Sequence, residues 1–139
     1  MTHDFERFLT AQSEDYDTAL AEIKSGKKKS HWMWYIFPQF CGLGQSHTSR
    51  FYAINSKEEA KAYLHHPVLG KRLVEISEAL LELENPDART IFGRPDDRKL
   101  KSCMTLFSEI SENEDSVFNK VLNAYFDGER DRKTLQLIR

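Results

Sequence analysis

A short stretch of the chain gathers aromatic, imidazole and amide side chains that could contact a ligand. Residues 30–44 read SHWMWYIFPQFCGLG and contain both tryptophans of the protein. Aromatic rings stack on planar ligands such as nucleobases, and polar groups beside them donate directed hydrogen bonds. We interpret this stretch as one wall of a ligand pocket. Its candidate binding residues, with the lysine before it and the serine after it, are Lys29, Trp32, Trp34, Tyr35, Gln39, Gly42, Gly44 and Ser46.

His31 is the candidate general acid of this pocket. An imidazole among rings that exclude water can act near neutral pH as an acid, a base or a hydrogen-bond donor. Lys29 ends a run of three lysines and could meet a phosphate. A structural interpretation stays open beside this functional one. In it, Trp32 and Trp34 fill a gap between helices, and the lysines form a solvated helix end.

A second group of polar side chains begins at Asp96. If this segment is helical, positions 97, 101 and 105 share one face, as do 98, 102 and 105. In the functional interpretation, Asp96 or Asp97 orients a water or accepts a ribose hydroxyl, while Lys99 and Ser102 contact the ligand. The alternative is an exposed, charged helix whose first-turn carboxylates suit the positive end of the helix dipole.

The sequence shows no spacing typical of a metal or phosphate site. His31, His47, His65 and His66 match no zinc pattern such as His-x-x-x-His with a carboxylate. Gly42-x-Gly44 lacks the Walker spacing and follows no strand as a Rossmann turn does. We therefore expect no metal and no cofactor, and glycines that let the backbone turn or pass close to a ligand.

Composition and charge exclude several classes of protein. The 139 residues carry a net charge of −2, so no global attraction draws the chain to nucleic acid or anionic lipid. No run approaches the ~20 apolar residues that span a membrane. Cys41 and Cys103 are too few and too far apart for a zinc framework, and we interpret them as reduced, buried thiols in preference to a disulfide. We expect one cytoplasmic domain over residues 1–139 that contacts neither membrane nor nucleic acid.

Apolar spacing predicts a helical fold. A single face carries Leu69, Leu73, Ile76, Leu80 and Leu83, in steps of four and three. Together with this helix over 69–83, the predicted helices cover 5–9, 13–25, 56–64, 96–110, 118–125 and 131–138.

Two shorter segments receive their own interpretation. Residues 49–54 could form one short strand, and His65 and His66 are expected to cap the carbonyls of the preceding helix. A single strand cannot make a sheet. We therefore predict an all-α fold, a compact single-domain bundle of about six or seven helices, with a long ordered aromatic and glycine loop between the second and third.

Several of these motifs closely resemble one protein family. They are SHWMWYIFPQ at 30–39, GLG at 42–44, HPVLGKRL at 66–73, IFG at 91–93 and KLKSCMTLF at 99–107. Over nearly its whole length the chain is similar to the domain of unknown function 1810 family. The resemblance implies a small, mainly bacterial, all-α protein, some of whose relatives are labelled calpastatin.

The order of segments is also similar to that of NADAR domains, which are tied to ADP-ribose and N-glycosidic bond chemistry. An early aromatic segment, a helix near 60–70 and an Asp-rich turn before a Met-containing helix carry this resemblance. The glutamate motif of NADAR domains is absent, so no catalytic glutamate is transferred to this chain.

Two hypotheses follow. In the first, a pocket between residues 31–46 and the helix at Asp96 binds a nucleotide-like or ADP-ribose-like small molecule and could hydrolyse an N-glycosidic bond. There, Asp96 or Asp97 orients water and His31 protonates the leaving group. In the second, the chain is a non-enzymatic protein-interaction module whose aromatic stretch is core.

Overall fold

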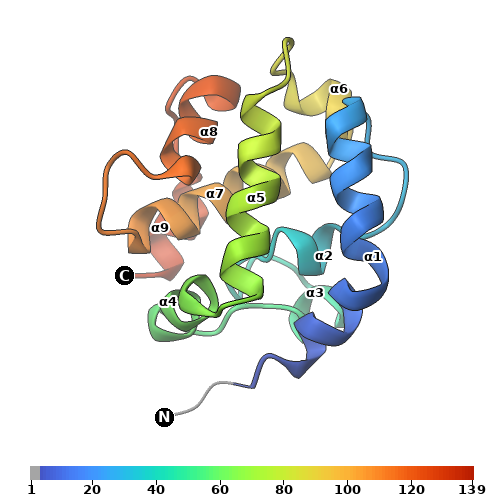
Figure 1. Cartoon of the computed structure of the whole chain (residues 1–139). Helices are drawn as coiled ribbons and strands as arrows, with labels where there is room; N and C mark the ends of the chain where they lie inside the picture. The colour runs from blue at the N-terminus through green and yellow to red at the C-terminus, as the bar shows by residue number, and fades with distance from the viewer. Residues whose placement is uncertain (1–3) are drawn as a thin grey trace.

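The computed structural model describes residues 4–139, which fold into helices joined by loops (Figure 1). The helices are α1 (Glu6–Ser25), α2 (Met33–Ile36), α3 (His47–Phe51), α4 (Lys57–His65), α5 (Leu69–Leu81), α6 (Ala88–Phe92), α7 (Asp96–Ile110), α8 (Val117–Phe126) and α9 (Arg132–Leu137). The predicted all-α fold class is confirmed. Within the described residues, no helix is long and apolar enough to cross a lipid bilayer.

Two long helices form the centre of the fold. In Figure 1, α5 stands in the middle with α1 on one side and α8 on the other, and α7 crosses behind it. α5 packs against α1, α4 and α8, while α7 packs against α4, α6, α8 and α9. The apolar face predicted for α5 is buried, because Leu69, Leu73, Ile76 and Leu80 all point into the core.

The first two predicted helices are one continuous helix, α1. Ser13 was predicted to cap a second helix, but its hydroxyl donates to the Thr10 carbonyl at 2.7 Å within α1. The buried face explains the continuity. It carries Phe8, Gln12, Tyr16, Ala19 and Ile23, at spacings of three and four along the whole helix. Tertiary packing therefore overrides the local cap signal.

The first half of the segment predicted as a strand, residues 49–54, is helix, because α3 runs to Phe51. α3 begins after Ser46, whose Oγ accepts a hydrogen bond from the Ser49 amide at 3.1 Å, the geometry of an N-cap. Among residues 4–139, extended pairing is limited to an isolated parallel bridge between Phe40 and Ile54. The long loop predicted for the aromatic stretch likewise contains a short helix, α2.

A tight corner joins α4 to α5. His66 caps the end of α4, as predicted, because its backbone amide donates to the Tyr63 carbonyl at 3.2 Å. Its side chain serves the next helix, since Nδ1 accepts hydrogen bonds from the Val68 and Leu69 amides at the start of α5. Gly70 lies against the backbone of Leu64, where an added Cβ would sit 1.8 Å from the carbonyl oxygen. Only glycine fits this crossing of α4 and α5.

Candidate functional site

One carboxylate from α1 fixes the start of the aromatic stretch. Glu22 accepts hydrogen bonds from the Lys29 amide at 2.8 Å, the Ser30 amide at 3.0 Å, the Ser30 hydroxyl at 2.6 Å and the Trp32 indole N–H at 2.9 Å. Burial acts to raise the pKa of Glu22, but the bonds from Ser30, Lys29 and Trp32 outweigh it and lower the pKa to about 2. The carboxylate therefore stays charged and holds the chain in place.

The aromatic stretch divides between core and surface. Trp32 is fully buried, with its ring centroid 6.1 Å from that of Phe37 and 6.4 Å from that of Phe92. Trp34 and Tyr35 are partly exposed and turn in different directions. Trp34 lines a cavity beside α7, whereas the Tyr35 hydroxyl donates to Asp15 of α1. The structure thus places Trp32 in the core and separates the other two rings.

The cavity beside Trp34 lies between the glycine loop, the first turns of α7 and the start of α9. Its volume is about 500 Å³. We call it the basic cavity. Its lining residues are Trp34, Gln39, Leu43, Gly44, Gln45, Ser46, Ser49, Pro95, Arg98, Lys99, Ser102, Asp131 and Lys133.

Positive charge dominates the wall of the basic cavity. Arg98 and Lys133 form no ion pair within residues 4–139. The Lys99 ammonium lies 4.6 Å from the Trp34 ring centroid, a cation–π contact that holds it at the cavity. Asp131 is the one lining carboxylate, and it accepts hydrogen bonds from the amide and hydroxyl of Thr134 as the N-cap of α9. Arg98 and Lys133 therefore line the cavity without an ion-pair partner among residues 4–139, whereas Lys99 is paired with Asp96 at 3.2 Å.

The two candidate catalytic aspartates lie behind this wall. Asp96 bridges two lysines, at 2.9 Å from Lys28 Nζ and 3.2 Å from Lys99 Nζ. Asp97 accepts from the Arg98 amide at 2.9 Å and lies 3.9 Å from Arg94 Nε. Neither aspartate is among the cavity-lining residues. Both carboxylates organise the first turn of α7.

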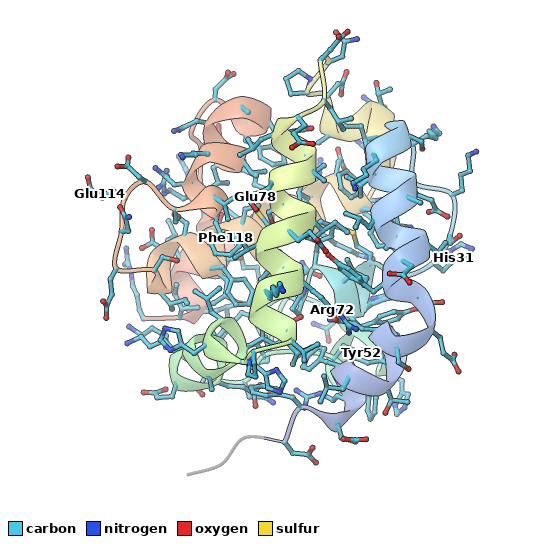
Figure 2. The ribbon with its side chains drawn as sticks, viewed as in Figure 1. His31, Tyr52, Arg72, Glu78, Glu114 and Phe118 are labelled. Atoms are coloured by element: carbon cyan, nitrogen blue, oxygen red, sulfur yellow. The ribbon has the colours of Figure 1, made fainter. Side chains whose placement is uncertain are left out.

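Three further candidates lie outside the basic cavity. Figure 2 places His31 at the edge of the molecule, pointing outward, and its side chain is exposed. Lys29 is also exposed, and Lys28 is the lysine that reaches α7. Gly42 lines a neighbouring cavity of about 150 Å³ together with Gln39. Its φ of +96° places it in the left-handed region, as the turn interpretation predicted.

Gly44 and Ser46 shape the mouth of the basic cavity. A Cβ on Gly44 would lie 2.4 Å from Ser49 Oγ, so glycine allows α3 to approach the loop closely. Ser46 Oγ lies 3.0 Å from Ser49 Oγ and caps α3. Gly44 was predicted to let the backbone turn or pass close to a ligand. In the structure, the group close to Gly44 is the Ser49 side chain.

Comparison with known proteins identifies the family. The sequence model of the family described as "Protein of unknown function (DUF1810)" matches residues 2–138. The chain belongs to this family.

A solved relative of this DUF1810 protein has the same fold. It is the conserved hypothetical protein Rv1873 from Mycobacterium tuberculosis, a crystal structure with 41% sequence identity and a TM-score of 0.92. The match covers 96% of this chain and 94% of the relative. No curated protein matches the chain.

The DUF1810 fold brings together part of the candidate site predicted from the sequence. The predicted residues that line the basic cavity are Trp34, Gln39, Gly44, Ser46, Lys99 and Ser102. Sequence reasoning missed Arg98, which stood inside the predicted motif, and Lys133, which comes from the far end of the chain. Sequence reasoning also missed Glu22 of α1, whose hydrogen-bond partners lie seven to ten residues away along an irregular segment.

Proposed function

We propose that the basic cavity binds a nucleotide-like anionic ligand of the ADP-ribose class. The observation that carries this proposal is the pairing of a ring with a cation: Lys99 Nζ lies 4.6 Å from the Trp34 ring centroid at the cavity wall. A base stacks on an aromatic ring, and a phosphate requires a nearby ammonium or guanidinium. The basic cavity therefore offers a ring for a base and an ammonium group for a phosphate next to each other.

The other lining groups suit the remaining parts of such a ligand. Arg98 and Lys133 add two cations that could contact a diphosphate. Gln39, Ser46 and Ser102 place amide and hydroxyl groups at the wall, where they could bond ribose hydroxyls. A volume of about 500 Å³ falls within the range that small-molecule sites occupy.

The geometry supports binding better than bond cleavage. Asp96 is held between Lys28 and Lys99, and Asp131 caps α9. His31 is exposed and is not among the residues that line the cavity. A general base must come within hydrogen-bond reach of the proton that it abstracts. Hydrolysis of an N-glycosidic bond would therefore require Asp96 or His31 to approach the bound ligand.

Calorimetric titration of the full chain with ADP-ribose, ADP and adenosine tests the proposal. We expect one site per chain for ADP-ribose and ADP, and at least tenfold weaker binding of adenosine because it lacks phosphate. Arg98→Glu should weaken ADP-ribose binding by about tenfold. Arg89→Glu is the matched control, since it makes the same charge change at an exposed position on α6.

Two results would contradict the binding proposal. One is the absence of any ADP-ribose or ADP binding by the unaltered chain, and the other is an equal loss in Arg98→Glu and Arg89→Glu. Incubation with NAD or ADP-ribose, followed by chromatography, addresses cleavage separately. We expect no release of base, and release abolished by Asp96→Asn would restore the hydrolytic hypothesis.

A further inference from the structure

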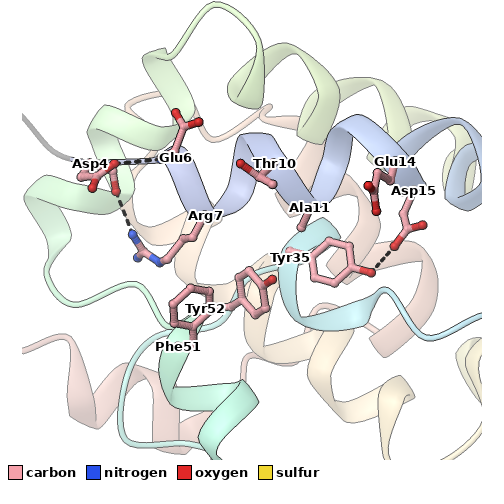
Figure 3. Close-up of a pocket in the computed structure, with 10 residues that line it drawn as sticks. All are labelled: Asp4, Glu6, Arg7, Thr10, Ala11, Glu14, Asp15, Tyr35, Phe51 and Tyr52. Atoms are coloured by element: carbon pink, nitrogen blue, oxygen red, sulfur yellow. Dashed lines mark hydrogen bonds between the residues drawn. The ribbon is translucent and has the colours of Figure 1, made fainter.

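A second cavity lies beneath α1, and its walls differ from those of the basic cavity. Its volume is about 660 Å³. Figure 3 shows Tyr35, Tyr52 and Phe51 side by side under the helix, with carboxylates at both ends of the row. We call it the acidic cavity. It shares no lining residue with the basic cavity.

The floor of the acidic cavity is aromatic and reachable from solvent. Phe51 is 50% exposed, an unusual position for a large apolar ring. Its centroid lies 4.9 Å from that of Tyr52 in an edge-on arrangement, and the Tyr52 centroid lies 5.1 Å from that of Tyr35. The negative faces of such rings attract cations, and their surfaces pack against methylene groups.

Carboxylates stand at the two ends of this floor. Asp4 and Glu6 lie at one end, and Glu14 and Asp15 lie at the other (Figure 3). Glu6 and Asp15 are roughly 14 Å apart along α1, from a rise of 1.5 Å per residue. Within residues 4–139, none of the four carboxylates forms an ion pair.

The one cation of the acidic cavity is occupied by other partners. Arg7 donates to the carbonyl oxygens of Asp4 at 2.8 Å and Ala53 at 3.1 Å, and it lies 3.5 Å from the Glu59 carboxylate. Its guanidinium also stacks over Phe8, at 4.4 Å from the ring centroid. Arg7 is therefore directed toward backbone carbonyls, Phe8 and Glu59, and it forms no ion pair with the carboxylates that line the cavity. Of these carboxylates, Asp15 accepts a hydrogen bond from the Tyr35 hydroxyl.

The distance between the two pairs of carboxylates determines which kind of cation can contact both pairs. Among the described residues, no three carboxylate, histidine or cysteine side chains lie close enough to hold a metal ion. A compact ion could neutralise only one end of the cavity. A flexible chain with an ammonium group at each end could reach both, and its methylene groups would cover Phe51 and Tyr52.

We propose that the acidic cavity binds a linear aliphatic polyamine. One terminal ammonium contacts Asp4 and Glu6, the other contacts Glu14 and Asp15, and the carbon chain lies across the aromatic floor. Binding of the polyamine involves no covalent step and no second component.

Calorimetric titration of the full chain with spermidine at low ionic strength tests the proposal. We expect one saturable site, with spermidine at least fivefold tighter than butane-1,4-diamine, which is too short to join both ends. Removing the exposed ring in Phe51→Ala, or one charge in Glu14→Gln, should each weaken binding by about fivefold. Glu78→Gln is the control, because it removes the same charge from an exposed position on α5 (Figure 2).

Any one of the following results would contradict the polyamine proposal. An equal loss in Glu14→Gln and Glu78→Gln would show attraction to net charge alone. Displacement of spermidine by Mg²⁺ at an equal concentration would show a simple cation site, and retained binding in Phe51→Ala would remove the aromatic floor from the account. A lysine-rich peptide that binds where spermidine does not would identify a protein-docking surface instead.

Discussion

The basic cavity and the acidic cavity are built on the same short segment of chain but carry opposite charge. α2 supplies Trp34 to one and Tyr35 to the other, while Ser49 of α3 lines the first and Phe51 lines the second. The long helices behind them differ. α7 brings Arg98 and Lys99 to the basic cavity, whereas α1 brings three carboxylates to the acidic one, and Asp4 just before α1 adds a fourth.

The contrast separates two contributions to recognition. The aromatic stretch provides rings to both cavities, so it sets the preference for planar or apolar ligand parts. The flanking helix then decides which charge the ligand must carry. Exchanging the charge on one helix should therefore change the ligand of one cavity and leave the other intact.

The largest effect should come from reversing charge at the basic cavity. The double variant Arg98→Glu/Lys133→Glu should weaken ADP-ribose binding by about a hundredfold, because each cation is replaced by a repelling carboxylate. Spermidine binding should change less than twofold. Calorimetry with both ligands measures this, and a parallel loss of spermidine would show that the cavities are not independent.

The second effect concerns Glu22, which anchors the start of the aromatic stretch. Glu22→Gln removes a carboxylate with four hydrogen-bond donors, so we expect it to lower the free energy of unfolding by about 2 kcal/mol. Thermal unfolding should show a fall of roughly 5–10 °C. Glu78→Gln again serves as the exposed control and should stay within about 0.5 kcal/mol of the unaltered chain.

The contribution of Glu22 should depend on pH in one direction. The pKa of Glu22 is about 2 in the folded chain, against an ordinary value of 4.5, so the folded state binds this proton less readily. Its stabilisation is therefore complete above pH 4.5 and is lost as the pH falls toward 2. Unfolding curves of the unaltered chain and Glu22→Gln should converge over that range. A constant difference from pH 6 to pH 2.5 would contradict the assignment.

The third effect tests the rings separately. Trp34→Ala should weaken ADP-ribose binding by about tenfold, the usual value of one stacked base. Trp34→Phe keeps a ring and should lose less than threefold. If both variants bind as tightly as the unaltered chain, the base does not stack on Trp34.

The smallest effect is that of salt. Raising ionic strength from 50 to 200 mM should weaken ADP-ribose binding by about threefold, because the cations of the basic cavity are partly exposed and screened. Adenosine has no phosphate, so its affinity should stay constant. Equal salt dependence for ADP-ribose and adenosine would show that the cations of the basic cavity do not contribute to binding.

Local patterns were sufficient to predict α5, α7 and part of the basic cavity. The apolar steps of α5 and the motif from Lys99 to Phe107 are visible without tertiary information. The Ser46 cap of α3 was also visible, but the aromatic residues that follow favour a strand on propensity and led to the wrong assignment. Trp34 and Lys99 were both selected from such motifs.

The remaining features depend on contacts between distant segments. Lys28 and Asp96 meet only because the loop after α1 packs beside α7, and Lys133 reaches the basic cavity from α9. Nothing in the local sequence distinguishes Lys28 from Lys29 or Trp32 from Trp34. Gln12 illustrates the same limit on α1: its amide donates to Tyr35 O and Tyr63 Oη, contacts that override the helix start predicted at Ser13.

The two tryptophans offer the most direct test of the basic cavity. Each gives one indole N–H signal in a ¹H–¹⁵N NMR spectrum, and only Trp34 lines the cavity, whereas the Trp32 indole is buried and bonded to Glu22. On titration with ADP-ribose, we expect the Trp34 signal to move saturably while the Trp32 signal stays in place. A Trp34 signal that does not move, or equal shifts of both, would contradict a ligand site at the basic cavity.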